Sequence, residues 1–418
     1  MTINEAPPSA ESAAADLADD EIVARATALR ELIRSQQDEA EELGHYTEEV
    51  HQALLGAGLY HLTTPRKFGG LERSIRTFMR TVVEIARADP GSGWCYSLGA
   101  AHGLNVAAMW PESAHERVFT NPRGYFRSSQ SLNPAGLARK VDGGYLVSGR
   151  SPYSSGCAFA THAIVALGLE GADAAGSASI LLQALIPRED FTIADDWGGD
   201  KVLGMRASGS NTILFENVFL PDDMVVPTTF IGQLPPERTG AAIYGNPMYL
   251  GVPISFLNLE LGALALGTAW AMLDGFVESA TTKRSALPPF GLRSTDPQIQ
   301  RDAGEALMKI HVAESTLLRA ADLLAEWSEA ACRDGVPFTP AMDTQLYGME
   351  ILAGRLASKA AELLFRDSGT SVSRKGHPMG RYLRDIMMYQ THGAIQYGHW
   401  AQVLGAMHLG MIDSPFAL

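Results

Sequence analysis

A histidine near the end of a mostly apolar helix is the first candidate for chemistry in this sequence. The segment RYLRDIMMYQTHGAIQ, residues 381–396, predicts a helix that breaks at Gly393 and carries His392 on its last turn. Because an imidazole has a pKa near neutrality, such a side chain can give or take a proton. Arg384 and Asp385 lie on the more polar side of the same helix, and we expect them to form a structural ion pair.

Two adjacent serines, Ser154 and Ser155, are the second candidate. They lie in PYSSGCAF, residues 152–159, between two segments with the composition of strands. Adjacent hydroxyls followed by a glycine could present a side-chain donor and backbone N–H groups to a flat polar ligand. A serine-rich β-turn is the simpler reading of the local sequence. The chain has no GxSxG motif and no Ser-His-Asp order, so the pattern does not favour a hydrolase.

A second histidine, His102, lies among small residues in LGAAHGLN. A buried histidine at such a place could simply donate to a backbone carbonyl, but its small neighbours also leave room for a flat ligand. The motifs HExxH and HxxxH are absent, and the three cysteines form no CxxC pair. We therefore expect no metal site.

Two loops between long helical segments carry groups that suit a phosphate. KRSALPPFGLR, residues 283–293, is basic and contains Arg284, while DSGTS, residues 367–371, combines glycine with Thr370 and Ser371. A basic loop and a hydroxyl-and-glycine loop together would suit a phosphate-bearing cofactor. Ordinary interhelical loops explain each of them alone.

The elements that must position these residues change in texture twice along the chain. Residues 21–121 have the apolar spacing of helices, residues 122–235 contain short β-rich runs between turn residues, and residues 236–418 return to long helical segments. We therefore predict an α+β protein that is mainly α, with three domains at these boundaries. The small, acidic residues 1–20 are expected to form a flexible tail.

Bulk composition excludes several classes of function. The chain has 418 residues and a formal net charge of −14, which argues against nucleic-acid and anionic-membrane surfaces. No run of about 18 apolar residues without charges appears, and three cysteines without paired spacing favour a reducing compartment. The expected location is the cytoplasm. Neither GxGxxG nor GxxxxGK[ST] is present, so no Rossmann or P-loop nucleotide site is supported.

Taken in order, several motifs resemble those of the acyl-CoA dehydrogenase superfamily over roughly residues 20–415. They are PRKFGGLE, ADPGSGWCYSLGAAHG, GGYLVSGRSPYSSG, GMRASGSNTILFENVFLPDD and RYLRDI, and GSNTILFENVFLP matches the superfamily pattern GSxxxxFxNVxxP. The resemblance implies an N-terminal helical domain, a central antiparallel β-barrel-like domain and a C-terminal four-helix bundle.

The segment YQTHGAIQ separates this chain from the dehydrogenases of that superfamily. They typically carry a glutamate base shortly after the Arg-Asp pair, although some members place it on another helix; here no carboxylate is present and His392 follows instead. The chain resembles the oxygenase component of two-component flavin-dependent monooxygenases, such as 4-hydroxyphenylacetate and secosteroid hydroxylases. The matching motifs are RD followed by six residues and His, SGWxxSxxxxH, and VSGRSPYSSG, in which Ser151 replaces the usual tryptophan.

This resemblance implies a set of roles. His102, Ser155 and His392 would be catalytic: Ser155 would hydrogen-bond flavin N5, His392 would assist a flavin C4a-hydroperoxide, and His102 would accept a substrate proton. Trp94, with His102 and Ser129, would contact the substrate. The residues implied for flavin binding are Ser128, Ser129, Ser154, Ser155 and Arg284, with Thr370 and Ser371 from a neighbouring subunit.

The implied reaction is hydroxylation of an aromatic or polycyclic small molecule with O2 as co-substrate. Reduced FMN, or FAD as an alternative, would come from a separate NAD(P)H:flavin reductase, and the enzyme would be a homotetramer. Three other functions stay open: an oxygenase of the same fold that acts on an amine or amino sugar, an acyl-CoA dehydrogenase, and a non-catalytic scaffold.

Overall fold

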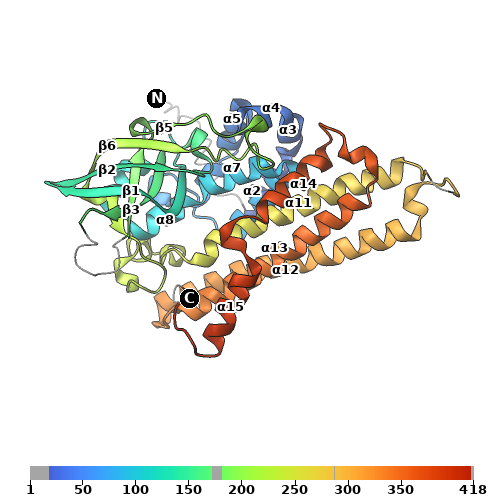
Figure 1. Ribbon diagram of the computed structural model, residues 1–418. Coiled ribbons are helices and arrows are strands. Elements are labelled where there is room, and N and C mark those ends of the chain that lie inside the picture. Colours follow the sequence, from blue (N-terminus) through green and yellow to red (C-terminus); the bar gives the residue numbers. More distant parts are fainter. Residues whose placement is uncertain (1–17, 172–180, 287, 416–418) are drawn as a thin grey trace, which may run out of the picture.

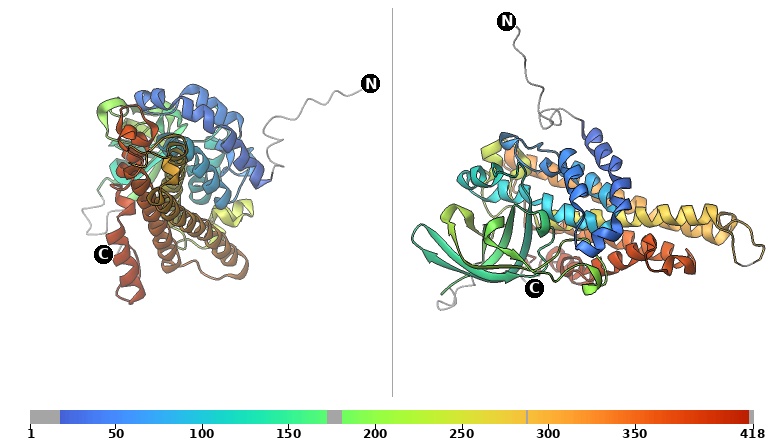
Figure 2. Two further views of the ribbon diagram at one scale, coloured as in Figure 1. Left: turned by 90° about the vertical axis from the view of Figure 1, so that its right-hand side faces the viewer. Right: turned by 90° about the horizontal axis from the view of Figure 1, so that it is seen from above.

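The computed structural model describes residues 18–171, 181–286 and 288–415 of the chain. Helices from the N-terminal part lie beside a sheet at one end of the molecule, and long helices extend to the other end (Figures 1 and 2). Most of the predicted tail lies outside the described residues. Asp19 and Asp20 do not belong to a tail, because they open the first helix.

Eight helices, with two short 3-10 turns between them, precede the sheet. They are α2 (Asp19–Ala28), α3 (Arg30–Ser35), α4 (Gln37–Leu43), α5 (Glu48–Gly56), α6 (Ile75–Ala88), α7 (Pro90–Ala100), α8 (His102–Met109) and α9 (Glu112–Phe119). Asp89 caps α7 by accepting the Ser92 N–H at 2.8 Å, and Pro90 follows at the first helical position. The helical run expected through His102 is divided at Ala101, so His102 begins α8.

The central strands form one seven-stranded sheet in the order β5-β6-β2-β1-β3-β4-β7. Their bounds are β1 (Ser128–Val141), β2 (Gly144–Ser151), β3 (His162–Leu169), β4 (Leu181–Pro187), β5 (Thr192–Ile193), β6 (Ile213–Pro221) and β7 (Val225–Pro227). The expectation of an antiparallel, barrel-like domain is corrected in two respects. β1 and β3 are parallel, and the first and last strands of the sheet do not pair, so the barrel is not closed.

The parallel pair has a direct consequence for the serine segment. β2 leaves β1 at Ser151, and the chain must cross to the other side of β1 before β3 starts at His162. Residues 152–161 make this crossing, and they include the short helix η3 (Cys157–Phe159). A turn closes within it, where the Cys157 N–H donates to the Ser154 carbonyl at 3.2 Å. Ser155 therefore lies on a crossover at the edge between sheet and helices.

The C-terminal part consists of α10 (Gly240–Tyr244), α11 (Ile254–Thr282), α12 (Pro297–Asp334), α13 (Pro340–Arg366), α14 (Pro378–Tyr389) and α15 (Tyr397–His408). Helix α11 is the central one: by length and composition it could cross a membrane, but 89% of its most apolar 18-residue window is buried inside the structure. It approaches α6 closely at Gly267, where a Cβ would lie 2.6 Å from that of Ala86. Its apolar character is thus explained by packing on both sides.

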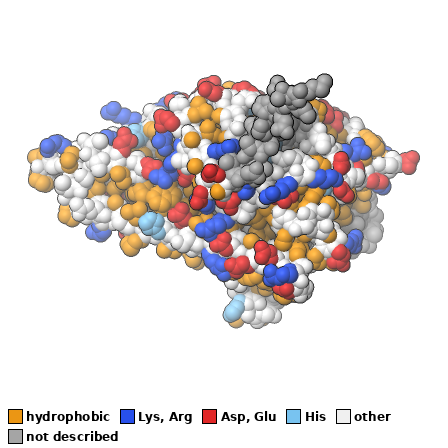
Figure 3. All heavy atoms as spheres, turned by 180° about the vertical axis from the view of Figure 1, so that it is seen from behind, with side chains coloured by type: hydrophobic (Ala, Val, Ile, Leu, Met, Phe, Trp, Pro, Cys, Tyr) orange, Lys and Arg blue, Asp and Glu red, His pale blue; other side chains and the backbone are white. Residues whose placement is uncertain are grey.

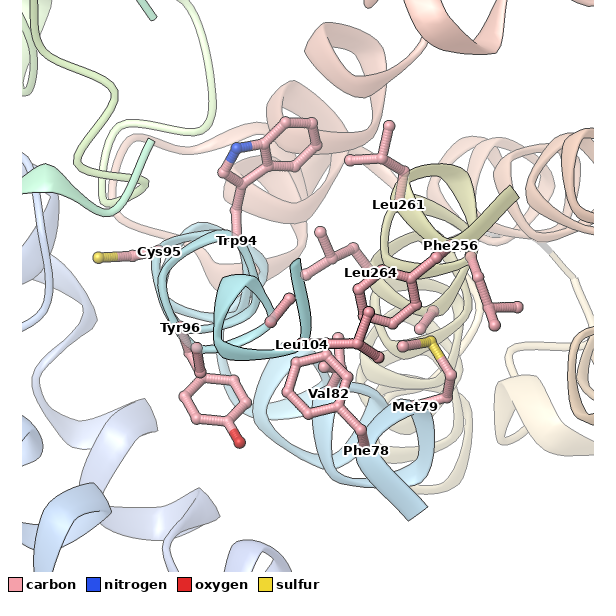
Figure 4. Packing of buried hydrophobic residues seen from close by; sticks show 14 of the residues in the cluster. Phe78, Met79, Val82, Trp94, Cys95, Tyr96, Leu104, Phe256, Leu261 and Leu264 are labelled. Carbon is pink, nitrogen blue, oxygen red and sulfur yellow. The ribbon is translucent and has the colours of Figure 1, made fainter. Parts of the chain in front are cut away.

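The contact between α6, α7 and α11 forms the part of the core next to the candidate site. Phe78 and Val82 of α6 meet Phe256 and Leu264 of α11, with Tyr96 of α7 beside them (Figure 4). Trp94 projects from α7 away from Tyr96 in the same view. Large apolar burial of this kind supplies most of the stabilisation of such helices, and it fixes the direction in which Trp94 points.

Two expectations for the segment 381–396 were wrong. Helix α14 ends at Tyr389, and His392 is the N-cap of the 3-10 helix η12 (Gly393–Ile395), because the Thr391 and His392 N–H groups already bond three residues back. Arg384 and Asp385 do not pair with each other: the Arg384 guanidinium contacts Glu41 at 2.6 Å, and the Asp385 carboxyl accepts the Met205 N–H at 2.6 Å. Asp385 thus ties α14 to the loop that precedes β6.

Stability should fall with rising pH because of Asp385. Burial, and next the charge of Asp89, raise the pKa of this carboxyl to about 8, so the folded state binds more protons than the unfolded state between about pH 4 and 8. Asp385→Asn, which keeps an acceptor for Met205, should flatten the decline by a few kcal/mol, since one pKa unit is worth about 1.4 kcal/mol. Urea unfolding at pH 5 and pH 8 measures it. With the exposed Asp142→Asn as control, an unchanged slope in Asp385→Asn would contradict the prediction.

Candidate active site

Trp94 joins two of the predicted catalytic residues. Its indole Nε1 donates to the Ser155 Oγ at 2.9 Å, and its ring meets the imidazole of His392 edge-on, with centroids 5.6 Å apart. Trp94 and Ser155 are buried, while His392 is exposed in the single chain. The three come from α7, from the crossover after β2 and from the segment after α14. Residues 61 and 298 positions apart from Trp94 are thereby brought to one place.

Two further serines, which sequence reasoning missed, extend this arrangement. Ser155 Oγ lies 2.7 Å from Ser210 Oγ, which lies 2.6 Å from Ser208 Oγ, and all three residues are buried. Ser208 and Ser210 belong to the loop before β6, in the segment ASGSN. A chain of buried hydroxyls therefore continues from Ser155 into the protein. Its only signal in the sequence is a run of small residues inside the GSNTILFENVFLP motif.

His102 lies against the first residue of β1. Its Nδ1 is 2.6 Å from the Ser128 carbonyl oxygen, which is an acceptor only, so Nδ1 carries the hydrogen and Nε2 keeps a lone pair. Burial lowers the pKa of His102 to about 4. The Nε2 atom and the hydroxyls of Ser128 and Ser129 are buried without a hydrogen-bond partner. Such groups cost free energy in a folded protein, and their grouping around His102 is what a polar ligand would satisfy.

Ser154 and Ser151 pair with each other. The Ser154 hydroxyl donates to the Ser151 carbonyl at 3.0 Å and lies 3.2 Å from the Ser151 hydroxyl. Both side chains are buried, so the serine that replaces the expected tryptophan packs inward. The hydroxyl of Ser154 is therefore used within the crossover, and Ser155 is the member of the pair that meets Trp94.

The phosphate candidates do not join this cluster within one chain. Arg284, Thr370 and Ser371 are exposed at the end of the bundle opposite the sheet, where the α11–α12 and α13–α14 connections lie (Figure 1). Lys283 Nζ donates to the Ser371 hydroxyl at 3.1 Å, so the two loops do meet each other. A guanidinium, an ammonium and two hydroxyls form an exposed, anion-binding type of surface there.

A buried carboxyl lies one helical turn from Trp94. Glu260 of α11 accepts a hydrogen bond from the Ser97 hydroxyl at 3.1 Å, and its second oxygen has no partner. Burial raises the pKa of Glu260 well above its usual range, so this carboxyl is held protonated at neutral pH and is a poor proton acceptor. The isolated glutamate in the apolar run FLNLELGALAL was the signal that sequence reasoning passed over.

Comparison with known protein families agrees with this architecture. The family model described as acyl-CoA dehydrogenase, N-terminal domain, matches residues 19–112, and that of the C-terminal domain matches residues 259–397. The chain belongs to the acyl-CoA dehydrogenase superfamily. The two matches flank the sheet and include α7, α8, α11 and α14, the helices that surround Trp94.

Within the superfamily the chain is similar to flavin-dependent monooxygenases. It is 29% identical over 373 residues to the flavin-dependent monooxygenase oxygenase subunit HsaA of Rhodococcus jostii, covering 88% of this chain and 93% of HsaA. It is 26% identical to the oxygenase component of p-hydroxyphenylacetate 3-hydroxylase of Acinetobacter baumannii, covering 90% and 86% of the two chains. These relatives confirm the predicted resemblance to oxygenase components.

A solved structure shows how far the fold extends. XiaF from Streptomyces, in complex with FADH2 and glycerol, superposes with a TM-score of 0.84 at 23% identity, over 94% of this chain and 96% of XiaF. The acyl-CoA dehydrogenase fold predicted from the sequence motifs is therefore confirmed over nearly the whole length, the unclosed sheet included.

His102 should remain neutral across physiological pH. Its folded-state pKa of about 4 lies below the usual 6.5, and the Ser128 carbonyl fixes the Nδ1–H tautomer. In 15N NMR spectra of histidine-labelled protein, the His102 resonances should show no titration between pH 5.5 and 8. His102→Gln assigns the signals, and a titration midpoint above pH 6 would contradict the burial argument.

Proposed function

We propose that this protein is the oxygenase component of a two-component monooxygenase that uses reduced flavin to hydroxylate an aromatic or polycyclic small molecule. The carrying observation is the contact of Trp94 with both Ser155 and His392, at a place where a carboxylate base is absent from the segment YQTHGAIQ. The flavin-dependent relatives with 26–29% identity support the class of reaction.

The residues present fit a flavin and a phenol. Ser155 supplies a hydroxyl suited to flavin N5, and the buried, unpartnered atoms near His102 supply sites for polar groups of a flat ligand. Bound reduced flavin supplies the electrons that activate O2. Burial of Trp94, Ser128 and Ser129 keeps water from this region, which protects a reactive group from hydrolysis and side reactions.

The two histidines have different tasks in this proposal. Neutral His102 presents the Nε2 lone pair and accepts a hydrogen bond from the substrate hydroxyl, which makes the substrate more nucleophilic. His392, held edge-on by Trp94, donates to or protonates the oxygen that leaves. Glu260 does not act as a dehydrogenase base, because its buried carboxyl is protonated.

The cofactor is best assigned as exchangeable FMN, with FAD as the alternative. No nucleotide-binding motif for NAD(P)H occurs in the sequence, so a separate reductase delivers the reduced flavin. We place the enzyme in the cytoplasm, since its three cysteines are free and two of them are buried.

A homotetramer completes the proposal. Exposed apolar side chains lie on three bundle helices, among them Met308 and Val312 one turn apart on α12, and Leu352 on α13. Apolar patches interrupt the charged surface in the view from behind (Figure 3), and patches of this kind mark interfaces between subunits. Such an assembly would carry Arg284, Thr370 and Ser371 of one subunit to the flavin phosphate of another.

Removal of the Ser155 hydroxyl tests the flavin contact. We expect Ser155→Ala to shorten the lifetime of the species that forms when protein-bound reduced FMN meets O2 and that is neither reduced nor oxidised flavin. Loss of one hydrogen bond of about 1–2 kcal/mol quickens its decay roughly five- to thirty-fold. Stopped-flow absorbance measures the decay. If wild-type protein reoxidises flavin with no such species, the proposed function is wrong.

His392→Ala should retain fold and flavin binding but lose coupled product formation, because the proton donor is gone while the Trp94–Ser155 hydrogen bond remains. The ratio of hydroxylated product to hydrogen peroxide, with a panel of phenols, indoles and polycyclic compounds, measures coupling. His399→Ala, in the nearby helix α15, serves as the control. Unchanged coupling in His392→Ala would remove His392 from the mechanism.

A further inference from the structure

The hydroxyl chain behind Ser155 restricts what Ser155 can do. A serine hydroxyl has one hydrogen and two acceptor lone pairs, and an indole N–H is a donor only. The Trp94 N–H at 2.9 Å therefore occupies one lone pair of Ser155 Oγ. The second contact, with Ser210 Oγ at 2.7 Å, can have either polarity when it is considered alone.

Ser208 decides between the two polarities. Ser208 is fully buried, and Ser210 Oγ at 2.6 Å is the one partner of its hydroxyl among the described residues. If the chain ran from Ser155 to Ser208, the Ser208 hydrogen would be buried without an acceptor, at a cost of about 1–3 kcal/mol. If it runs from Ser208 through Ser210 to Ser155, every hydrogen of the two inner serines is used. The second polarity is favoured, since buried unpaired donors are rarer than buried unpaired acceptors.

We infer that Trp94, Ser210 and Ser208 make Ser155 an obligate hydrogen-bond donor, which can give a hydrogen to a bound flavin but has no lone pair with which to accept one. Ser210 and Ser208 are positioning residues that act through Ser155. The inference rests on the proposed function for the identity of the ligand, and it adds a preference between redox states of that ligand. Oxidised flavin presents a lone pair at N5, whereas reduced flavin carries a hydrogen there.

The backbone around the chain holds this polarity in place. The Gly156 N–H donates to the Ser208 carbonyl at 3.1 Å, and the Ser154 N–H donates to the Asn211 carbonyl at 3.1 Å, so the crossover and the loop before β6 are tied on both sides of the serines. Asp385 holds the same loop through Met205. The hydroxyls thus cannot move apart without breaking several backbone bonds. A donor that cannot accept is also unable to draw the proton from N5, which suits a site that must suppress unproductive loss of that proton.

Ser210→Ala tests the inference through binding, without turnover. Loss of the Ser210 hydroxyl frees one lone pair on Ser155, so the penalty on a ligand that carries a hydrogen at N5 is relieved. We expect the affinity for reduced FMN to rise relative to that for oxidised FMN by roughly five- to thirty-fold. A tenfold change equals a rise of about 30 mV in the two-electron potential of bound flavin. Titrations of tryptophan fluorescence with oxidised FMN, and with reduced FMN under anaerobic conditions, give the two dissociation constants.

Two further variants make the result decisive. Ser208→Ala should shift the ratio in the same direction by less, because Ser210 can still donate to Ser155. Ser358→Ala removes another buried serine, whose hydroxyl bonds to its own helix α13, and should leave the ratio unchanged. A ratio that is unchanged or falls in both Ser210→Ala and Ser208→Ala overturns the inference while leaving the proposed function intact. Failure of the wild type to bind FMN in either state overturns both.

Discussion

The hydrogen bond from the Trp94 indole to the Ser155 hydroxyl is the contact on which the site depends. It links the second half of the N-terminal helices to the sheet, and the face of Trp94 that remains receives the edge of His392. Each residue alone has an ordinary structural explanation. Together they fix the direction of a hydroxyl and the place of an imidazole, and the core between α6, α7 and α11 prevents Trp94 from turning away (Figure 4).

The crossover between β2 and β3 is possible only because glycines let backbones touch. Gly156 has a φ of +77°, and a Cβ there would lie 2.8 Å from the Cys95 carbonyl oxygen of α7. At Gly99, one turn further along α7, a Cβ would collide with the guanidinium of Arg127. Arg127 is fully buried, donates to the Cys95 carbonyl at 2.8 Å and lies over the Tyr60 ring at 4.5 Å. The chain thus accepts a buried cation in order to clamp α7 to the start of β1.

Sequence reasoning reached the fold class and the residues Trp94, His102, Ser155 and His392, because periodicity and spaced motifs are local properties of the chain. It failed where a partner lies far away in sequence. The helical period continued past Tyr389, but turn bonds at Thr391 and His392 end the helix before the histidine. Arg384 and Asp385 looked like a pair because they are neighbours, yet each bonds to a different part of the fold. Ser208 and Ser210 had no chemical signal, since their role arises only when the loop before β6 meets the crossover.

The pKa of His102 decides how far this residue can take part in catalysis under the proposed function. Burial, opposed by the hydrogen bond to Ser128 and assisted by the charge of Arg127, lowers that pKa to about 4, whereas a phenol has a pKa near 10. A gap of about six units corresponds to about 8 kcal/mol against complete transfer of the proton. His102 therefore orients the substrate hydroxyl through Nε2 and receives its proton only as oxygen transfer proceeds and the phenol becomes more acidic. A neutral, weakly basic imidazole beside a buried arginine is thus consistent with a site that keeps its substrate protonated until the reactive oxygen is in place.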